Sequence, residues 1–350
     1  MKGEHSQRRI LFLINIEKLT DVADNLLEVK DLITSFETED GWLRAVDQVS
    51  FSVPRGKTVG IVGESGCGKS VTAMSIVQLL PQPMGQILGG EIIFNGKKIN
   101  GFSSREMRKI RGVDIGVIFQ EPMTALNPCH RIGKQLSEVF LLHTKMNKKE
   151  AWQASIDILE KVKIPAPEQC VGEYPHQLSG GMRQRVVIAM ALALKPDLLI
   201  ADEPTTALDV TVQQQILTLI KDLQKEMEMS VILITHDLGV IAQSCDEVVV
   251  MYAGRVVEKA SAEDLFKSPK HAYTKGLLNS IPRLETPRKS ELNTIPGNVA
   301  SIHDFVKGCR FCQRMGIPAR ELVIRPDFEE VAEEHWVETC PRCFNQDLTS

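Results

Sequence analysis

The chain has 350 residues, 43% of them hydrophobic and 25% charged, which is enough for a large core in an ordinary globular protein. Its 41 basic and 45 acidic residues give a formal net charge of −4, which excludes the global basic field of a nucleic-acid-binding protein. No apolar run approaches the roughly 20 residues that span a bilayer, so a role at a membrane requires a partner.

The first third of the chain predicts an extension followed by strands and one helix. Residues 10–16 are an apolar heptad, but no small-residue cleavage site follows, so we expect an N-terminal extension over 1–24 rather than a secretory signal. Strands are predicted over 26–30, 49–53 and 58–62, and again over 91–94 and 115–119. A helix is predicted over 70–80, where Pro81 and Pro83 stop it.

The remainder is first helical, then alternates strands and helices. Residues 127–164 are helical in pattern, most clearly over 148–162, and Ser179 is expected to cap a helix that runs to about residue 194. Residues 197–201 and 231–235 are typical of buried parallel strands, and the amphipathic helix 212–226 between them completes a βαβ unit. A hairpin over 247–259 turns at Ala253-Gly254, and a last helix covers 272–281.

A proline-containing stretch after residue 281 predicts a linker. We therefore divide the chain into the extension (1–24), a main domain (25–282) and a C-terminal extension (283–350).

Residues Gly63-Glu64-Ser65-Gly66-Cys67-Gly68-Lys69-Ser70 form a phosphate-binding loop. Glycines let backbone amides surround phosphate oxygens, and the following helix N-terminus adds positive potential. Lys69 is expected to bridge the β- and γ-phosphates and the Ser70 hydroxyl to bind Mg²⁺, and Val71 also belongs to the predicted ATP site. Cys67 is interpreted as a small residue at a variable position rather than a redox switch.

Two acids follow the apolar run that ends at Ala201. Asp202 is expected to hold Mg²⁺, and Glu203 to polarise the attacking water as the catalytic base. Together with the phosphate loop they predict a nucleotide-hydrolysing site.

With Leu178-Ser179-Gly180-Gly181-Met182-Arg183-Gln184, these motifs resemble the ATP-binding cassette (ABC) family over about residues 26–282. The resemblance implies an α/β P-loop NTPase fold: a RecA-like core, an antiparallel β subdomain and a helical signature subdomain, here with a small cysteine-bearing C-terminal extension. It also implies that Ser179, Gly180 and Gly181 bind the ATP held by a facing subunit, so that two cassettes clamp the nucleotide. Asp209, in Ala207-Leu208-Asp209, matches the loop that crosses the dimer interface.

Three further residues acquire roles from this resemblance. Gln120 matches the glutamine that contacts magnesium and water, and His236 matches the histidine that contacts the γ-phosphate. Phe36 lies where the family has an aromatic residue stacked on adenine, with Trp42 as a less favoured substitute.

Two short sequence motifs narrow the resemblance to one branch of the ABC family. Tyr174-Pro175-His176-Gln177 and Met123-Thr124-Ala125-Leu126-Asn127-Pro128 resemble the dipeptide, oligopeptide and nickel importer ATPases. This implies an ATPase subunit that drives uptake of peptides or a related solute, peripheral at the cytoplasmic face of the cell membrane. Its implied partners are two membrane permease subunits, a second ABC ATPase (a paralogue or itself) and, indirectly, an extracytoplasmic substrate-binding protein, but no nucleic acid. Residues 121–138 are expected to receive the permease's coupling helix.

Eight cysteines are present, and the last four form two Cys-x-x-Cys pairs: Cys309, Cys312, Cys340 and Cys343. This spacing suits a tetrahedral thiolate site. The resemblance implies that relatives with this tail carry four cysteines that can hold a 4Fe–4S cluster, but the middle cysteines are spaced differently here. A cluster, zinc and no metal remain alternatives, and a structural staple is favoured over electron transfer.

Three other functions compete with the importer. A soluble ABC ATPase acting on ribosomes or nucleic acid is disfavoured, because the chain has one cassette, no long coiled-coil insertion and no basic field. An exporter ATPase is disfavoured by Pro175-His176-Gln177 and by the tail. A redox sensor would depend on the four tail cysteines alone.

Overall fold

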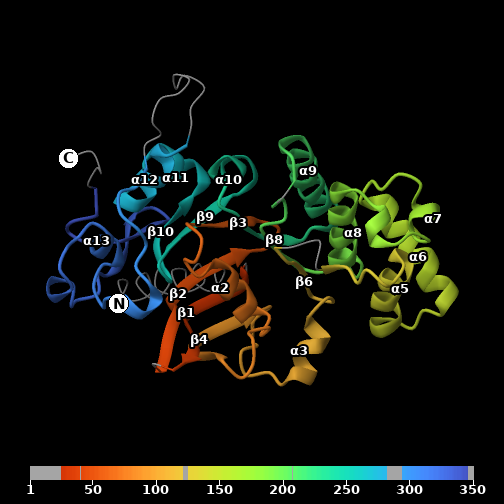
Figure 1. The fold of residues 1–350 in the computed structure, drawn as a ribbon, viewed down its shortest axis with the longest axis horizontal. Helices are drawn as coiled ribbons and strands as arrows, with labels where there is room; N and C mark the ends of the chain where they lie inside the picture. Colours follow the sequence, from red (N-terminus) through yellow and green to blue (C-terminus); the bar gives the residue numbers. More distant parts are fainter. Residues whose placement is uncertain (1–24, 40, 121–124, 207, 282–293, 346–350) are drawn as a thin grey trace, which may run out of the picture.

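The computed structural model describes residues 25–39, 41–120, 125–206, 208–281 and 294–345. The predicted N-terminal extension, most of the predicted linker, Met123, Thr124 and Ala207 lie outside these residues. Figure 1 shows two sheets at the centre, a group of helices at one end and the C-terminal segment at the other. None of the described helices is long and apolar enough to cross a membrane.

The larger sheet carries the parallel strands. Its order is β11-β12-β10-β9-β3-β8-β7-β6, and the five strands from β9 to β6 are parallel. β3 and β8 are buried along their whole length, which explains their continuous apolar sequences. The strands are β3 Thr58–Val62, β6 Ile115–Ile118, β7 Leu198–Asp202, β8 Ser230–Ile234, β9 Glu247–Tyr252, β10 Arg255–Ser261, β11 Phe328–Ala332 and β12 His335–Glu338.

The smaller sheet is antiparallel and has the order β2-β1-β4-β5. Its strands are β1 Asn25–Thr38, β2 Gly41–Pro54, β4 Gly85–Phe94 and β5 Lys97–Lys98. They extend well beyond the predicted segments because register shifts interrupt the alternation of apolar and polar residues, for example between Val29 and Leu32.

The helices confirm the predictions where the periodic segment is long. α6, α8, α9 and α12 occupy the predicted positions to within about two residues, whereas α2 ends at Ile76, before Gln78 adopts a φ of 50°. The shortest helices were not predicted, because one or two turns carry too little periodicity. The helices are α2 Lys69–Ile76, α3 Ser104–Ile110, α5 Ile132–His143, α6 Lys148–Lys161, α7 Pro167–Cys170, α8 Gly180–Leu192, α9 Val210–Met227, α10 Leu238–Ser244, α11 Ala262–Lys267, α12 Ala272–Asn279 and α13 Arg310–Arg314.

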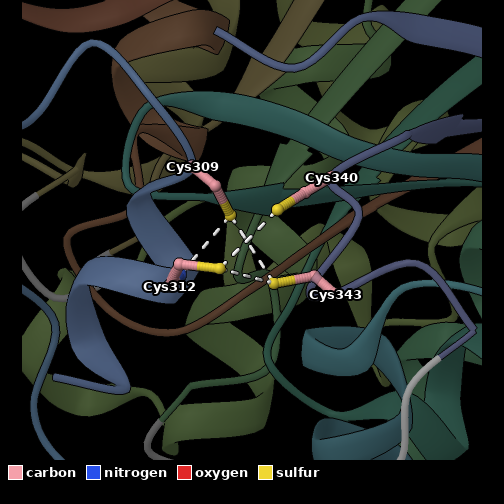
Figure 2. Close-up of side chains that lie close together, drawn as sticks. All are labelled: Cys309, Cys312, Cys340 and Cys343. Carbon is pink, nitrogen blue, oxygen red and sulfur yellow. Dashed lines mark hydrogen bonds between the residues drawn. The ribbon is translucent and has the colours of Figure 1, made fainter. Parts of the chain in front are cut away.

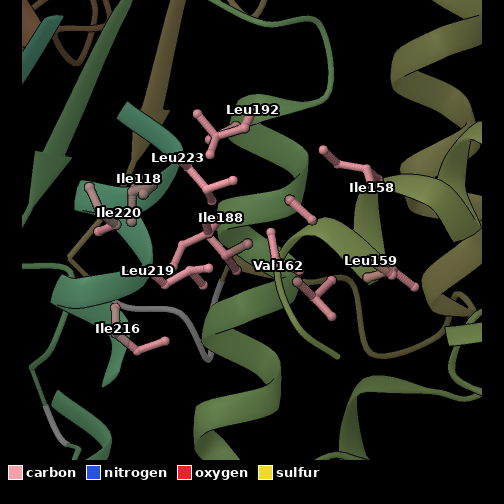
Figure 3. Packing of buried hydrophobic residues seen from close by; sticks show 14 of the residues in the cluster. Ile118, Ile158, Leu159, Val162, Ile188, Leu192, Ile216, Leu219, Ile220 and Leu223 are labelled. Carbon is pink, nitrogen blue, oxygen red and sulfur yellow. The ribbon is translucent and has the colours of Figure 1, made fainter. Parts of the chain in front are cut away.

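One core joins the helical end of the molecule to the larger sheet. Figure 3 shows Ile188 and Leu192 of α8 packed between α9 and the segment around α6. α8 therefore has apolar contacts on several sides, and its N-terminus at Ser179 is held in a fixed place by buried packing.

The C-terminal segment joins the larger sheet. β12 pairs with β10 through Glu258↔Val337 and Lys259↔Trp336, and β11 pairs with β12. A core cluster shared by β9, α12 and α13 joins residues on both sides of position 282. The predicted boundary at 282 stays a prediction, but the two sides share a sheet and a core.

Candidate functional site

The phosphate loop, residues 63–70, follows β3 and continues into the first turn of α2, as predicted. A Cβ on Gly63 would lie 2.1 Å from the Met251 carbonyl oxygen, and one on Gly68 would lie 2.8 Å from that of Ala45. Both glycines also have positive φ, 152° and 102°. Only glycine fits these two positions, so the loop's path depends on them.

Lys69 is buried at the centre of this loop. Its ammonium donates to the carbonyl oxygens of Gly63, at 2.7 Å, and Glu64, at 3.1 Å. Burial raises the pKa of the neighbouring Cys67 thiol, against the opposing charge of Lys69. A buried, protonated thiol has little reactivity, which favours the interpretation of Cys67 as a small packing residue.

A cavity of about 430 Å³ opens at this loop, and we call it the nucleotide cavity. Its lining from the predicted site comprises Ser65, Gly66, Gly68, Lys69, Ser70, Val71, Gln120 and Glu203. The structure thus brings together residues that lie more than 130 positions apart in the sequence.

Asp202 ends β7 and is buried beside Ser70. Burial raises the pKa of this carboxyl, and the charge of Glu203 adds to that effect, whereas a hydrogen bond from Ser70 opposes it. Among the described residues, no group hydrogen-bonds to Asp202 Oδ1. A buried carboxylate oxygen without a partner, next to a hydroxyl, fits a hard divalent cation such as Mg²⁺.

Glu203 lies where three segments meet. Gln120 Nε2 donates to its Oε2 at 3.2 Å, Thr206 Oγ1 donates to the same oxygen at 2.9 Å, and His236 Nδ1 lies 3.3 Å from its Oε1. Burial alone would raise the pKa of Glu203, but the hydrogen bonds from Thr206 and His236 outweigh it and lower the pKa. The carboxylate is therefore ionised at neutral pH and able to accept a proton from water.

The signature residues do not reach this cavity within one chain. Ser179 caps α8, its hydroxyl accepting from Met182 N at 3.3 Å, and Ser179 and Gly180 are exposed. Gly181 is held close to α9, since a Cβ on it would lie 2.9 Å from Val212 Cγ1. Asp209 caps α9 and accepts from Val212 N at 2.9 Å. None of these residues lines the nucleotide cavity.

The cavity wall beyond the phosphate loop differs from what the sequence predicts. Phe36 is paired with Gly85 across β1 and β4, its ring lying over that glycine, and it does not line the cavity. The wall instead contains Ala45 of β2 and four residues of the C-terminal segment: Val299, Ala300, Ile302 and Phe305. Sequence reasoning missed these four, and they carry no motif that would have revealed them.

The four tail cysteines converge, as Figure 2 shows. Cys312 Sγ lies 3.2 Å from Cys343 Sγ and 3.6 Å from Cys340 Sγ, and the Cys309 and Cys343 sulfurs are 3.6 Å apart. All four side chains are buried and none forms a disulfide. This confirms the proximity that the paired spacing predicts, and we call the group the cysteine site.

His271 supports the cysteine site. Its Nδ1 accepts a hydrogen bond from Tyr273 N at 3.1 Å, so its Nε2 carries the proton. Burial lowers the pKa of this imidazole to about 4, which keeps it neutral. One ring nitrogen lies within 4.8 Å of the Cys309 sulfur, and Nε2 has no hydrogen-bond partner among the described residues. A neutral N–H at this place suits a thiolate that is bound to metal.

An apolar groove lies between β6, α5 and α8, with a volume of about 390 Å³. We call it the docking groove; its apolar lining includes Val117, Phe119, Val139, Leu142, Val187 and Met190. Leu142 is 72% exposed, and Phe119 is 41% exposed. Ala125, Gln135 and Glu138, from the segment predicted to receive a coupling helix, also line it, whereas residues 121–124 lie outside the described part of the chain.

Comparison with protein families gives two matches. Residues 46–206 match the ABC transporter family, and residues 257–315 match the C-terminal region of oligopeptide/dipeptide transporters. The second match extends across the predicted boundary at 282.

Curated relatives are similar over most of their length. The oligopeptide transport ATP-binding protein OppD of Bacillus subtilis is 50% identical over 315 residues, which cover 90% of this chain and 88% of that protein. OppD of Escherichia coli is 52% identical over 292 residues, covering 83% and 86%. The dipeptide transport ATP-binding protein DppD of Bacillus subtilis is 52% identical over 291 residues, covering 83% and 87%.

Solved structures match the cassette. The ATP-binding cassette MJ0796, solved as a dimer in a post-hydrolysis state with ADP and phosphate, has a TM-score of 0.61 and 28% identity, and the match covers 67% of this chain and 98% of that one. The cbiO1 protein of Clostridium perfringens, part of the cbiONQ transporter complex, has a TM-score of 0.59 and 29% identity, covering 70% and 92%. The predicted cassette fold is confirmed.

Proposed function

The chain belongs to the ABC transporter ATP-binding proteins of the oligopeptide and dipeptide type, and from that membership we propose how its residues perform this work. It is the ATP-hydrolysing subunit of an importer for peptides or a related solute. The observation that carries this function is the phosphate loop beside the Asp202–Glu203 pair, joined in one chain to the transporter-type C-terminal region.

In this proposal the phosphate loop holds the triphosphate. Lys69 exchanges its loop carbonyl partners for the β- and γ-phosphate oxygens, while Ser70 and Asp202 hold Mg²⁺. The metal ion, when bound, neutralises charge on the phosphates. Adenine stacking on Phe36 stays a prediction, and the segment containing Ile302 and Phe305 is better placed to contact the base or ribose.

Hydrolysis requires a water molecule aligned with the γ-phosphate. Glu203, ionised and hydrogen-bonded by Gln120 and Thr206, accepts the proton of that water as its oxygen attacks phosphorus. His236 lies at the same carboxylate and is placed to contact the γ-phosphate. The bond to the β-phosphate oxygen breaks, leaving ADP and inorganic phosphate.

The complete site needs a second cassette. Ser179, Gly180 and Gly181 lie outside the nucleotide cavity of their own chain, at an exposed helix N-terminus that suits an anion. We propose that they bind the γ-phosphate of a facing ATPase, which is a copy or a paralogue. Loss of the γ-phosphate then removes contacts from both subunits and opens the clamp.

The docking groove provides a site for the membrane subunits. An exposed apolar groove beside Gln120 suits an amphipathic helix from a permease, because Leu142 and Phe119 lose water on contact. We propose that two permease subunits dock in this way and place the chain at the cytoplasmic face of the cell membrane. A substrate-binding protein would then act through the permease.

Co-purification from detergent-solubilised membranes tests this function. We expect the tagged chain to recover hydrophobic permease subunits, and Leu142→Asp to lose most of them because a carboxylate in the groove must be desolvated. Ile324→Asp is the matched control, since Ile324 is 81% exposed on the tail and does not line the groove. Recovery of ribosomes without permeases would favour the soluble ATPase instead.

For the cysteine site we propose a tetrahedral zinc ion. Sulfur ligands about 2.3 Å from zinc lie roughly 3.8 Å from one another, close to the 3.2 and 3.6 Å separations of these thiols. A 4Fe–4S cluster binds each cysteine to a different iron and holds the sulfurs farther apart. Zinc would serve as a structural staple for the tail.

A further inference from the structure

An arginine of the tail contacts the phosphate loop. Arg314, the last residue of α13, places Nη1 2.6 Å from Glu64 Oε2. The Arg314 side chain is 4% exposed and that of Glu64 is 32% exposed. This ion pair joins two segments that are 250 positions apart, at the loop that holds the triphosphate.

Both partners are held by further hydrogen bonds. Arg314 also donates from Nε to Pro296 O at 2.8 Å and from Nη2 to Ile295 O at 3.0 Å, so its guanidinium is fixed in orientation. The backbone N–H of Glu64 donates to Tyr273 Oη at 2.9 Å. Residues of both α12 and α13 therefore hold Glu64, the second residue of the phosphate loop, in place.

The same supports lead to the cysteine site. Cys309 caps α13, and its sulfur accepts a hydrogen bond from Cys312 N at 3.4 Å. Arg314 lies two residues after Cys312. Phe311, between the two cysteines, packs on Tyr273 with ring centroids 5.6 Å apart. α13 thus carries two cysteines at its start and the contact to the phosphate loop at its end.

We propose that Arg314 is a positioning residue that couples the order of the cysteine site to nucleotide affinity. It does so by neutralising Glu64 and by anchoring the phosphate loop. This inference rests on the proposed ATPase function. Glu64 is the carboxylate within a loop that must hold a polyanion, and its carbonyl lies 3.1 Å from Lys69 Nζ. Without Arg314, that carboxylate loses its counter-charge, and its negative charge lowers the affinity of the loop for a polyanion. The coupling is reciprocal, so bound nucleotide also stabilises α13.

Titration of the full-length protein with Mg–ATP tests the pair. We expect Arg314→Gln to weaken binding about fivefold to tenfold, the lower end of common coupling between sites. Adding Glu64→Gln to Arg314→Gln should restore part of the lost affinity, because it removes the unpaired charge while the anchoring contact stays lost. Arg320→Gln is the matched control, because Arg320 is exposed on the same tail and lies outside both Cys-x-x-Cys turns.

A recovery of Mg–ATP affinity in the double variant distinguishes a positioning role of Arg314 from a general folding defect. If Arg314→Gln binds Mg–ATP as well as wild type, or if the double variant stays as weak as the single one, the inference is overturned. Wild-type protein that does not bind Mg–ATP at all would instead contradict the proposed function.

Amide hydrogen exchange supplies a second readout that a purely local effect would not move. In wild type, Mg–ATP should slow exchange over 309–314 severalfold, and in the double variant this protection should shrink. Equal exchange with and without nucleotide in wild type would show that the tail and the loop are not coupled.

Discussion

Glu203 has a backbone φ of 47°, which residues with side chains adopt rarely. Its N–H donates to Ile234 O at 2.9 Å, so the end of β8 holds it in this conformation. The carboxylate consequently turns toward Gln120 and His236 instead of following the strand. Local backbone strain of this kind, maintained by neighbouring strands, is common at functional sites, where a side chain must be held in one orientation.

Glu203→Gln should retain Mg–ATP binding and lose turnover by a factor of about 10² to 10⁴, the usual contribution of a general base. The amide keeps the size of the side chain but cannot accept the proton of water, so ATP should accumulate in a stable dimer. Steady-state phosphate release and size-exclusion chromatography measure both effects. Glu226→Gln, in an exposed pair with Lys161, is the control. Normal phosphate release by Glu203→Gln would remove this residue from catalysis.

At the scale of elements, two short turns build the cysteine site. Cys309 and Cys312 lie at the start of α13, and Cys340 and Cys343 lie in the turn after β12, where Cys343 N donates to Cys340 O at 2.9 Å. Each Cys-x-x-Cys pair turns both of its sulfurs to one side. The sheet pairing of β12 with β10 and the packing of α13 on the aromatic core then bring the two turns together.

Metal analysis of protein prepared without oxygen should find about one zinc per chain, since four thiolates complete one tetrahedral site. Cys312→Ser or Cys340→Ser should lose most of it, whereas Cys129→Ser, which changes an exposed cysteine, should not. If the analysis finds iron and inorganic sulfide in place of zinc, the site holds an iron–sulfur cluster. Protein with neither metal would contradict any metal role for the site.

At the scale of the whole molecule, Asp47 connects the smaller sheet to the tail. This buried carboxylate of β2 accepts from Arg255 Nε of β10 at 2.9 Å and from Arg310 Nη2 of α13 at 2.8 Å. Burial alone would raise the pKa of Asp47, but Arg310, Arg255 and Arg325 outweigh it and lower the pKa. The three-way contact fixes the tail against both sheets.

Asp47→Asn should lower the free energy of unfolding by about 3 to 5 kcal/mol at neutral pH, because the buried Arg310 loses its carboxylate partner and Arg255 keeps only Glu338, 3.8 Å away. Because the folded pKa of Asp47 is lowered, its contribution is present above the ordinary carboxyl pKa and is lost as pH falls through the folded value. The difference between wild type and variant should therefore shrink below about pH 4. Denaturant unfolding at several pH values measures this. Asp222→Asn is the control, because Asp222 pairs with Lys163 on the exposed surface. If both variants lower the free energy of unfolding by the same small amount, Asp47 does not have this structural role.

Features encoded by contiguous residues were predictable. The phosphate loop, the strand that ends in Asp202 and the helix capped by Ser179 each follow from a local pattern whose physical requirement is local too. β3 matches its predicted bounds because a short apolar run between a turn and a glycine loop leaves little freedom. Shorter helices such as α10, which Asp237 caps, carried too few turns to be recognised.

The sequence by itself determined which chemistry the chain performs, because the groups that bind phosphate, metal and water are specified by residue type and spacing within short segments. Only the tertiary structure decided what surrounds those groups: the tail wall of the nucleotide cavity, the pairing of β12 with β10, and the Arg314–Glu64 contact. These depend on segments up to 260 positions apart, which are joined by the burial of a shared core rather than by any periodic pattern along the chain.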